Sequence, residues 1–440
     1  PYLSAAIISF PTFPLNHCNQ EGLVVAGSNK KTVLCYISSW AVYRRSQGQF
    51  TISDVDVNLC THLVYAFLGI NETTNTVVSR DSWADYVTNG RGFGQLKDLV
   101  KLKDEAPNLK VLISVGGWSE GSEKFSNMAA STVKRIAFVE SVFQFLRRNQ
   151  LDGVDICWMF PTDRGGIAED KRNFATLLKE LRTRLNEDNR ILTVLMTGKR
   201  YIVDPGYDVR TISQSVDYIN VMSYDFNGPW ERKTGVNAPL ISENEFNVEF
   251  SIDYLIKKGA TPSKILVGIP TFGHSFTMKN VPDNGNYLKV PSDNGYLSQW
   301  TREKGIIGYN EVCYELSTTS GWKEMWDDAS STPYAVNHKK FVSYDNQRSI
   351  LEKVSFAMDL DLAGIMTWSI DTDDFRGDCA VPGDPTPAFP LLRAINNGIA
   401  EALAARSKNK TTPDKKPNSV IRVDPLPIIV LALAALMPVF

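Results

Sequence analysis

Short apolar runs alternate along the chain with longer stretches in which apolar residues recur at helical spacing. Eight of the runs are almost continuously apolar, as the strands of a parallel sheet covered on both faces require. They occupy residues 33–38, 62–68, 110–115, 151–157, 191–196, 216–224, 265–270 and 362–368. Between them, residues 131–149 and 169–186 have the spacing of amphipathic helices. The alternation of strands and helices predicts an α/β fold with a parallel sheet.

Eight strands joined by helical crossovers indicate a closed (β/α)8 barrel, the TIM barrel, rather than an open sheet. The interval between the seventh and eighth apolar runs is much longer than one helix needs, and it contains several aromatic residues and glycines. We therefore predict a barrel formed by residues 31–271 and 343–402, with a small inserted α+β domain at residues 272–342.

The two ends of the chain differ in pattern from the predicted barrel. Residues 1–30 form an extension whose apolar, uncharged part at 2–15 is either the remnant of a signal peptide or a loosely packed segment. Residues 403–424 are polar and contain proline, which predicts a linker. Residues 425–440 are hydrophobic and uncharged, but shorter than the roughly 20 apolar residues of a membrane-spanning helix. They predict a cleaved tail that directs glycolipid anchoring at the cell surface or, alternatively, a short membrane helix.

Composition narrows the functional classes. The chain has 47 Lys and Arg residues against 49 Asp and Glu, so no net basic field draws it onto nucleic acid. The four histidines, His17, His62, His274 and His338, are scattered, and neither HExxH nor CxxC spacing occurs. The sequence therefore predicts no metal site, no cofactor and no nucleic-acid partner.

In a barrel of this kind, functional residues lie at the carboxyl ends of the strands. Aromatic side chains are frequent at the predicted ends, at Trp40, Phe67, Trp118, Tyr224 and Trp368. Their acidic and sulfur-containing neighbours are Asp155, Cys157, Met159, Met222 and Asp225. Aromatic rings at a barrel mouth suit stacking on the apolar faces of sugar rings, while carboxylates and hydroxyls bind the polar rim. The alternative is that these rings are simply large core residues.

Seven segments of the chain, in order, resemble the strand-end motifs of family 18 glycoside hydrolases, the chitinase and chitinase-like group. They are residues 34–44, 60–70, 110–119, 151–161, 221–230, 265–276 and 363–379. The resemblance covers roughly residues 31 to 400 and implies a (β/α)8 barrel with an inserted α+β domain, in agreement with the strand pattern.

The resemblance also implies secretion and two disulfides. These join Cys35 to Cys60 and Cys313 to Cys379. Cys18 and Cys157 would then be unpaired. An extracellular location would make the sequons at Asn71 and Asn409 candidate glycosylation sites.

The fourth-strand motif of the family is DxxDxDxE, and this chain departs from it at two acidic positions. Asp152 and Asp155 match the first two acids, whereas Cys157 replaces the third and Met159 replaces the glutamate. The resemblance implies hydrolysis assisted by the N-acetyl group of the substrate, with the glutamate donating a proton to the leaving oxygen. A thioether has no proton to donate, and a thiol is normally neutral. Because general-acid catalysis contributes about 10²–10⁴-fold, the sequence predicts a pseudoenzyme.

The sugar-binding positions of the family are matched in this chain. They are Tyr36, Trp40, Phe67, Gly117, Trp118, Asp155, Met222, Tyr224, Asp225 and Trp368. They predict a cleft that binds chitin or β-1,4-linked N-acetylglucosamine oligomers without cutting them. On the insert side, His274 replaces the usual arginine, and Lys339-Lys340-Phe341 lacks the expected tryptophan. These changes favour one alternative, a signalling or structural protein without sugar affinity. A second alternative is a weakly active chitinase that uses an unexpected proton donor.

Overall fold

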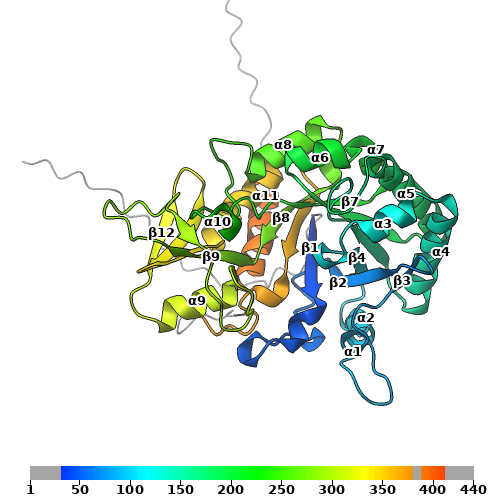
Figure 1. Ribbon diagram of the computed structural model, residues 1–440, viewed down its shortest axis with the longest axis horizontal. Coiled ribbons are helices and arrows are strands. Elements are labelled where there is room, and N and C mark those ends of the chain that lie inside the picture. The colour runs from blue at the N-terminus through cyan, green and yellow to red at the C-terminus, as the bar shows by residue number, and fades with distance from the viewer. Residues whose placement is uncertain (1–30, 380–387, 412–440) are drawn as a thin grey trace, which may run out of the picture.

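The computed structural model describes residues 31–379 and 388–411, and its centre is a barrel of eight parallel strands (Figure 1). The strands are β1 (Thr32–Ser38), β2 (His62–Asn71), β4 (Lys110–Gly116), β5 (Gly153–Cys157), β6 (Ile191–Thr197), β7 (Tyr218–Met222), β8 (Ile265–Pro270) and β15 (Gly364–Trp368). Strand β15 pairs with β8 and with β1, and β1 also pairs with β2, so the sheet closes on itself. All eight apolar runs form strands, and the predicted (β/α)8 barrel is confirmed.

Helices surround the barrel (Figure 1). They are α2 (Gln95–Glu105), α3 (Glu123–Ala129), α4 (Thr132–Arg148), α5 (Asp170–Leu185), α6 (Arg200–Gly206), α7 (Val209–Ser215), α8 (Val248–Lys257) and α10 (Gln347–Asp359). The helices predicted at 131–149 and 169–186 are α4 and α5, each within one residue at both ends. The loop after β2 adds β3 (Thr76–Val78), antiparallel to β2, and the short α1 (Ser82–Asp85).

A second sheet is built from the chain between β8 and β15, and Figure 1 shows it beside the barrel. Its antiparallel strands are β9 (Phe272–Met278), β10 (Ser292–Asp293), β11 (Ile306–Gly308), β12 (Lys323–Asp327), β13 (Thr332–Asn337) and β14 (Lys340–Ser343). Helix α9 (Tyr309–Thr318) contributes Val312 to a buried cluster with Ile307, Ala335 and Val342 of this sheet. This lobe therefore has a small hydrophobic core of its own.

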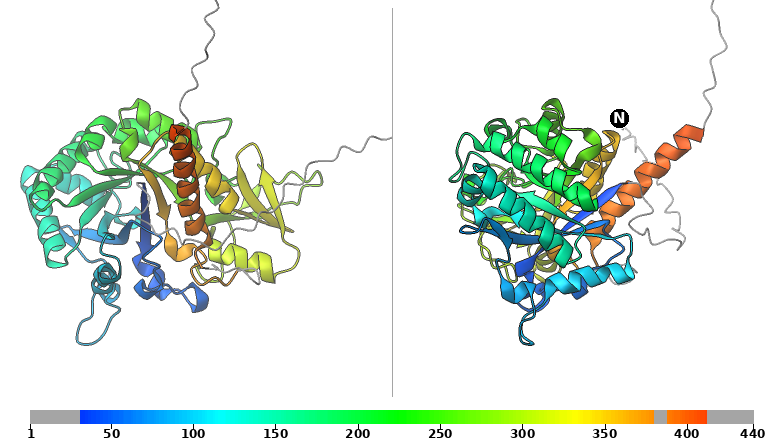
Figure 2. Two further views of the ribbon diagram at one scale, coloured as in Figure 1. Left: turned by 180° about the vertical axis from the view of Figure 1, so that it is seen from behind. Right: turned by 90° about the vertical axis from the view of Figure 1, so that its right-hand side faces the viewer.

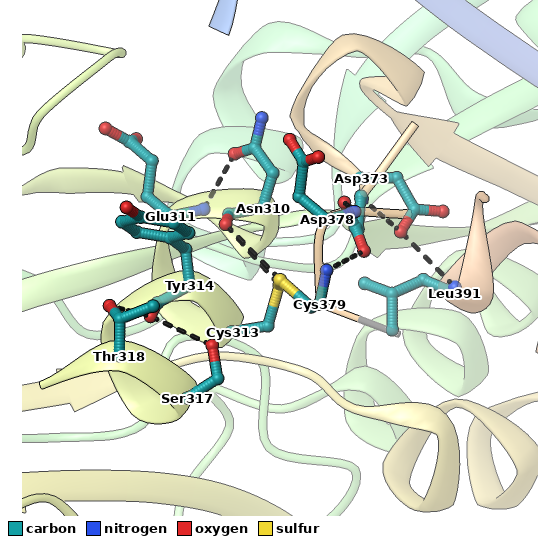
Figure 3. The surroundings of a disulfide bond; sticks show 11 residues. Asn310, Glu311, Cys313, Tyr314, Ser317, Thr318, Asp373, Asp378, Cys379 and Leu391 are labelled. Atoms are coloured by element: carbon teal, nitrogen blue, oxygen red, sulfur yellow. Dashed lines mark hydrogen bonds between the residues drawn. A yellow bond between two sulfur atoms is a disulfide. The ribbon is translucent and has the colours of Figure 1, made fainter. Parts of the chain in front are cut away.

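Both implied disulfides are present. Cys35 at β1 is bonded to Cys60, and Cys313 on α9 is bonded to Cys379. The second bond, drawn in Figure 3, joins the second lobe to the chain that follows β15. Cys157 is free and buried, whereas Cys18 lies outside the described residues.

Figure 2 shows α11 (Pro390–Thr411) along the back of the molecule, beside α10. A polar linker was predicted from residue 403, and this boundary is wrong, because the helix continues through it. Residues 401–405, EALAA, are strong helix formers. Arg406 then binds the Asp361 carboxylate, with 2.9 Å between Nη1 and Oδ1, which attaches this part of the helix to the barrel.

Several predictions concern segments outside the described residues. These are the extension at 1–30, the rest of the linker from residue 412, and the hydrophobic tail at 425–440. The side chain of Asn409 is also outside them, whereas Asn71 ends β2 and its Oδ1 accepts bonds from the next turn. Among the residues that are described, no helix is both long and apolar enough to cross a bilayer.

A buried carboxyl group that contacts the start of α11 predicts a pH-dependent stability. Asp373 has no exposed surface and accepts a hydrogen bond from the backbone N–H of Leu391, which Figure 3 shows. It accepts a second from the backbone N–H of Leu392. Burial raises the pKa of Asp373 from 3.8 to about 7, against the opposing effect of these bonds. A raised native pKa stabilises the folded state below the ordinary pKa, and this contribution is lost as the pH rises through about 7.

We expect Asp373→Asn to flatten the fall in unfolding free energy between about pH 4 and pH 8 by a few kcal/mol, since one pKa unit corresponds to about 1.4 kcal/mol. Urea unfolding at a series of pH values measures this difference. Glu72→Gln, at an exposed turn, is the control and keeps the slope of the unaltered protein. Equal slopes for Asp373→Asn and the unaltered protein would contradict the prediction.

Candidate functional site

A polar network fills the barrel interior at β5. Side chains alternate along a strand, so Asp155 and Cys157 point inward together. The Asp155 carboxylate accepts bonds from Ser114 Oγ at 2.6 Å and Thr193 Oγ1 at 2.7 Å. Asn220 Nδ2 lies 3.2 Å from the same carboxylate and also donates to the Tyr36 hydroxyl at 2.8 Å. Strands β1, β4, β5, β6 and β7 are thus joined through one buried acid.

Burial changes how two predicted sugar contacts are interpreted. Neither Asp155 nor Tyr36 has exposed surface. Burial raises the pKa of Asp155, and its hydrogen bonds oppose that rise; burial also raises the pKa of Tyr36. Both side chains therefore lie beneath the accessible surface of this structure, and as sugar contacts the two residues stay predictions. Met222 and Tyr224 are also largely buried.

Sulfur occupies both altered motif positions. Cys157 has no exposed surface, and burial, together with the nearby Asp155, raises the pKa of its thiol well above its ordinary value. The thiol is therefore neutral. Met159 follows the end of β5, where it is partly buried against the main hydrophobic core. Between them, Trp158 points away from the barrel interior towards the surrounding helices, where it stacks on Phe125 of α3 with 5.1 Å between ring centroids.

Aromatic rings from three strand ends contact one another at the mouth. Trp368 lies 5.2 Å from Tyr36 and 5.4 Å from Phe67, measured between ring centroids. Trp40 is stacked 6.2 Å from Phe67 and lies 6.4 Å from Trp368. Gly117 has a φ of +88°, and a Cβ there would lie 2.6 Å from the Phe67 ring, so only glycine lets this ring approach the end of β4. The cluster is continuous from the buried Tyr36 to Trp40, which is 38% exposed.

Asp225 is held by three groups at the other side of the mouth. Its backbone N–H donates to Asn237 Oδ1 at 2.9 Å, and its carbonyl accepts from Lys199 Nζ at 2.6 Å. Its carboxylate lies 2.8 Å from Nε2 of His274, which is almost fully buried. The other imidazole nitrogen lies 3.0 Å from the Gly305 carbonyl, an acceptor, so that nitrogen carries a proton. His274, on β9, thus connects the second lobe to Asp225.

Asp152, the first motif acid, lies away from this group. It precedes β5, where it pairs with Lys103 at 2.9 Å between Nζ and Oδ2 and accepts a bond from the Val111 N–H. Asp152 therefore joins the start of β5 to β4 and α2 at the amino end of the barrel strands.

Sequence reasoning missed three residues of the mouth: Arg164, Lys199 and Asn237. Arg164 covers one face of the Trp118 indole and binds two carbonyls. Burial lowers the pKa of Lys199, which donates to the Asp225 carbonyl. All three lie in loops without hydrophobic periodicity, so no pattern pointed to them. The position of Arg164 five residues after Met159, in the loop that leaves β5, was the one available signal.

Comparison with known protein families matches residues 32–373 to glycosyl hydrolases family 18. The chain belongs to glycosyl hydrolase family 18. This family 18 chain is 40% identical to a probable chitinase 2 of Drosophila melanogaster, over 89% of this chain and 85% of that protein. It is also 40% identical to the crystal structure of Ostrinia furnacalis group IV chitinase in complex with allosamidin, with a TM-score of 0.79, covering 84% of this chain and 99% of that one.

A further solved relative of this family 18 chain is human YKL-39, described as a pseudo-chitinase with retained chitooligosaccharide binding properties. It is 32% identical, with a TM-score of 0.76, and the match covers 84% of this chain and all of that chain. The relatives of this family 18 protein therefore include both proteins named chitinases and a protein described as a pseudo-chitinase.

Proposed function

We propose that this chitinase-like protein binds β-1,4-linked N-acetylglucosamine oligomers at the barrel mouth and does not hydrolyse them. The observation that carries the proposal is the pair of sulfur side chains, Met159 and Cys157, beside an aromatic cluster that includes Trp40 and Trp368.

The absence of hydrolysis follows from proton chemistry. Met159 has no proton to give to a leaving oxygen, and the buried Cys157 thiol carries no negative charge to stabilise a cationic intermediate. Asp155 cannot replace them, because it has no exposed surface and its oxygens are occupied by donors from neighbouring strands. The Asp225 carboxylate is paired with His274. Neither Asp155 nor Asp225 is therefore free to donate a proton at the scissile bond.

Binding is supported by the exposed groups of the mouth. Trp40 is 38% exposed and Trp118 59%, so both present ring surface on which the apolar face of a pyranose can stack. The Asp225 side chain is 45% exposed and offers a carboxylate oxygen to an amide N–H or a hydroxyl. Human YKL-39, with its retained chitooligosaccharide binding, is a precedent within the family.

A second candidate, a weakly active chitinase, is favoured by the names of the 40% identical relatives. It would require a proton donor other than the motif glutamate. For either candidate we propose secretion, because two disulfides persist in an oxidising compartment. Attachment to a membrane through residues 425–440 remains a hypothesis about a segment outside the described residues.

One experiment separates these functions. Isothermal titration with chitohexaose measures binding, and chromatography of the same samples after long incubation measures cleavage. We expect saturable binding with no shorter oligomers formed, and much weaker binding of cellohexaose, which lacks acetamido groups. No binding at millimolar chitohexaose would favour a signalling or structural role, whereas chitobiose release would favour the weak enzyme.

A further inference from the structure

Trp118 is the most exposed of the aromatic residues predicted to bind sugar, at 59%. It begins the short turn η4 (Trp118–Glu120), which lies between Gly117 and Gly121, both in left-handed conformations. These glycines determine the path of the backbone. They do not determine the orientation of the indole, which meets the Phe160 ring edge-on at 6.5 Å between centroids.

Arg164 contacts the indole and two backbone groups at once. Its Cζ lies 3.6 Å from the centroid of the Trp118 ring, so the guanidinium covers one face. Its Nη1 donates to the Trp118 carbonyl and to the Met159 carbonyl, both at 2.9 Å. A single planar cation therefore joins the ring, the turn that carries the ring, and the backbone at the altered catalytic position.

The loop that carries Arg164 is itself held in place. The Arg164 carbonyl accepts a bond from the Ser122 N–H at 3.3 Å, across to the Trp118 side. Asp170, at the start of α5 and without exposed surface, accepts from the Ile167 N–H at 2.7 Å and from Ser126 Oγ at 2.8 Å. These hydrogen bonds fix the loop and so fix the Arg164 guanidinium relative to Trp118, as precise positioning requires.

We propose that Arg164 is a positioning residue that holds the Trp118 indole as a fixed platform for an N-acetylglucosamine ring. The inference rests on the proposed sugar binding. The guanidinium covers one face of the indole, the side chain keeps 59% of its surface exposed, and the cation–π contact favours one ring orientation. A ring already held in its binding orientation loses less conformational entropy when the sugar binds.

The test uses the full chain labelled with 5-fluorotryptophan and observed by ¹⁹F NMR. The Trp118 resonance is identified by its loss in Trp118→Phe. In the unaltered protein without sugar we expect one narrow Trp118 line, which broadens or splits in Arg164→Gln as the indole samples other orientations. The affinity of Arg164→Gln for chitohexaose falls about three- to tenfold, the range expected for one cation–π contact and its ordering effect. Arg164→Lys, which keeps the charge but not the planar fork, gives an intermediate result.

The chain offers a matched control in Arg348, whose Cζ lies 3.7 Å from the Trp326 ring in the second lobe. Arg348→Gln leaves the Trp118 line and the sugar affinity unchanged. Adding Arg164→Gln to Trp118→Ala, which removes the ring, causes no further loss of affinity, because the residue acts through the indole.

The two possible failures are distinguishable. An unchanged Trp118 line in Arg164→Gln, with sugar binding intact, overturns the positioning role alone. No chitohexaose binding by the unaltered protein overturns the proposed function and the platform role together, whatever the Trp118 line shows.

Discussion

The double variant Cys157→Asp, Met159→Glu is expected to release product from a chitobiose glycoside that the unaltered protein leaves intact. Met159 is partly buried at the end of β5, so a glutamate in its place can reach the mouth. At position 157 the new aspartate adjoins Asp155 inside the barrel, and two adjacent carboxylates share one proton because both cannot ionise cheaply. The pair then carries the negative charge that the Cys157 thiol lacks, while the glutamate introduced at position 159 supplies the proton that Met159 cannot give.

We expect the double variant to exceed the unaltered protein by at least about 10²-fold, the lower range for general-acid catalysis. Release of 4-methylumbelliferone from its chitobioside measures the rate. The matched control is Cys157→Asn, Met159→Gln, which has nearly the same shape but no acid, and it stays inactive. Hydrolysis by the unaltered protein at a rate close to that of the double variant would contradict the assignment of Met159 and Cys157 as the cause.

Trp368→Ala is expected to have the second-largest effect, on both sugar binding and stability. Its indole contacts Tyr36, Phe67 and Trp40, so its removal takes away the centre of the aromatic cluster. Large-to-small changes of buried aromatic residues cost about 3–5 kcal/mol; Trp368 is only partly buried, so about 2–3 kcal/mol is expected. The loss of a stacking surface and the disorder of Phe67 and Trp40 lower chitohexaose affinity by at least about tenfold.

Urea unfolding and titration calorimetry separate the two effects of Trp368→Ala. The control is Trp326→Ala, which removes an indole from β12 in the second lobe and leaves chitohexaose affinity unchanged. If Trp368→Ala and Trp326→Ala retain the same affinity, the aromatic cluster is structural and does not contact the sugar.

Side chains at the mouth of this barrel differ in whether the fold depends on them. Asp155 joins several strands through buried hydrogen bonds, so its role in the fold persists whether or not the protein is an enzyme. Met159 and Cys157 place sulfur where buried ionisable acids would need compensating partners, so the fold avoids the cost of burying a charge there. His274 places its Nε2 2.8 Å from Asp225 Oδ1, so the two side chains are in contact across the mouth.

Several features could be predicted from the sequence because they depend on local pattern. The eight barrel strands were evident, since a strand covered on both faces must be apolar along its length. Helices α4 and α5 were placed to within one residue at each end, because an amphipathic face repeats with the helical period. The end of α11 was predicted wrongly, because polar residues such as Ser407 and Lys408 occur in linkers and in exposed helices alike.

The sequence by itself determined where the barrel strands lie along the chain and which side chains occupy positions 157 and 159, because both depend only on neighbouring residues of the chain. Only the tertiary structure decided which candidates reach the surface, that His274 meets Asp225 across 49 positions, and that Arg164 covers Trp118 across 46. These contacts join loops from different strand ends. Their geometry depends on barrel closure and on left-handed residues such as Gly117 and Asp225, which no periodicity along the chain encodes.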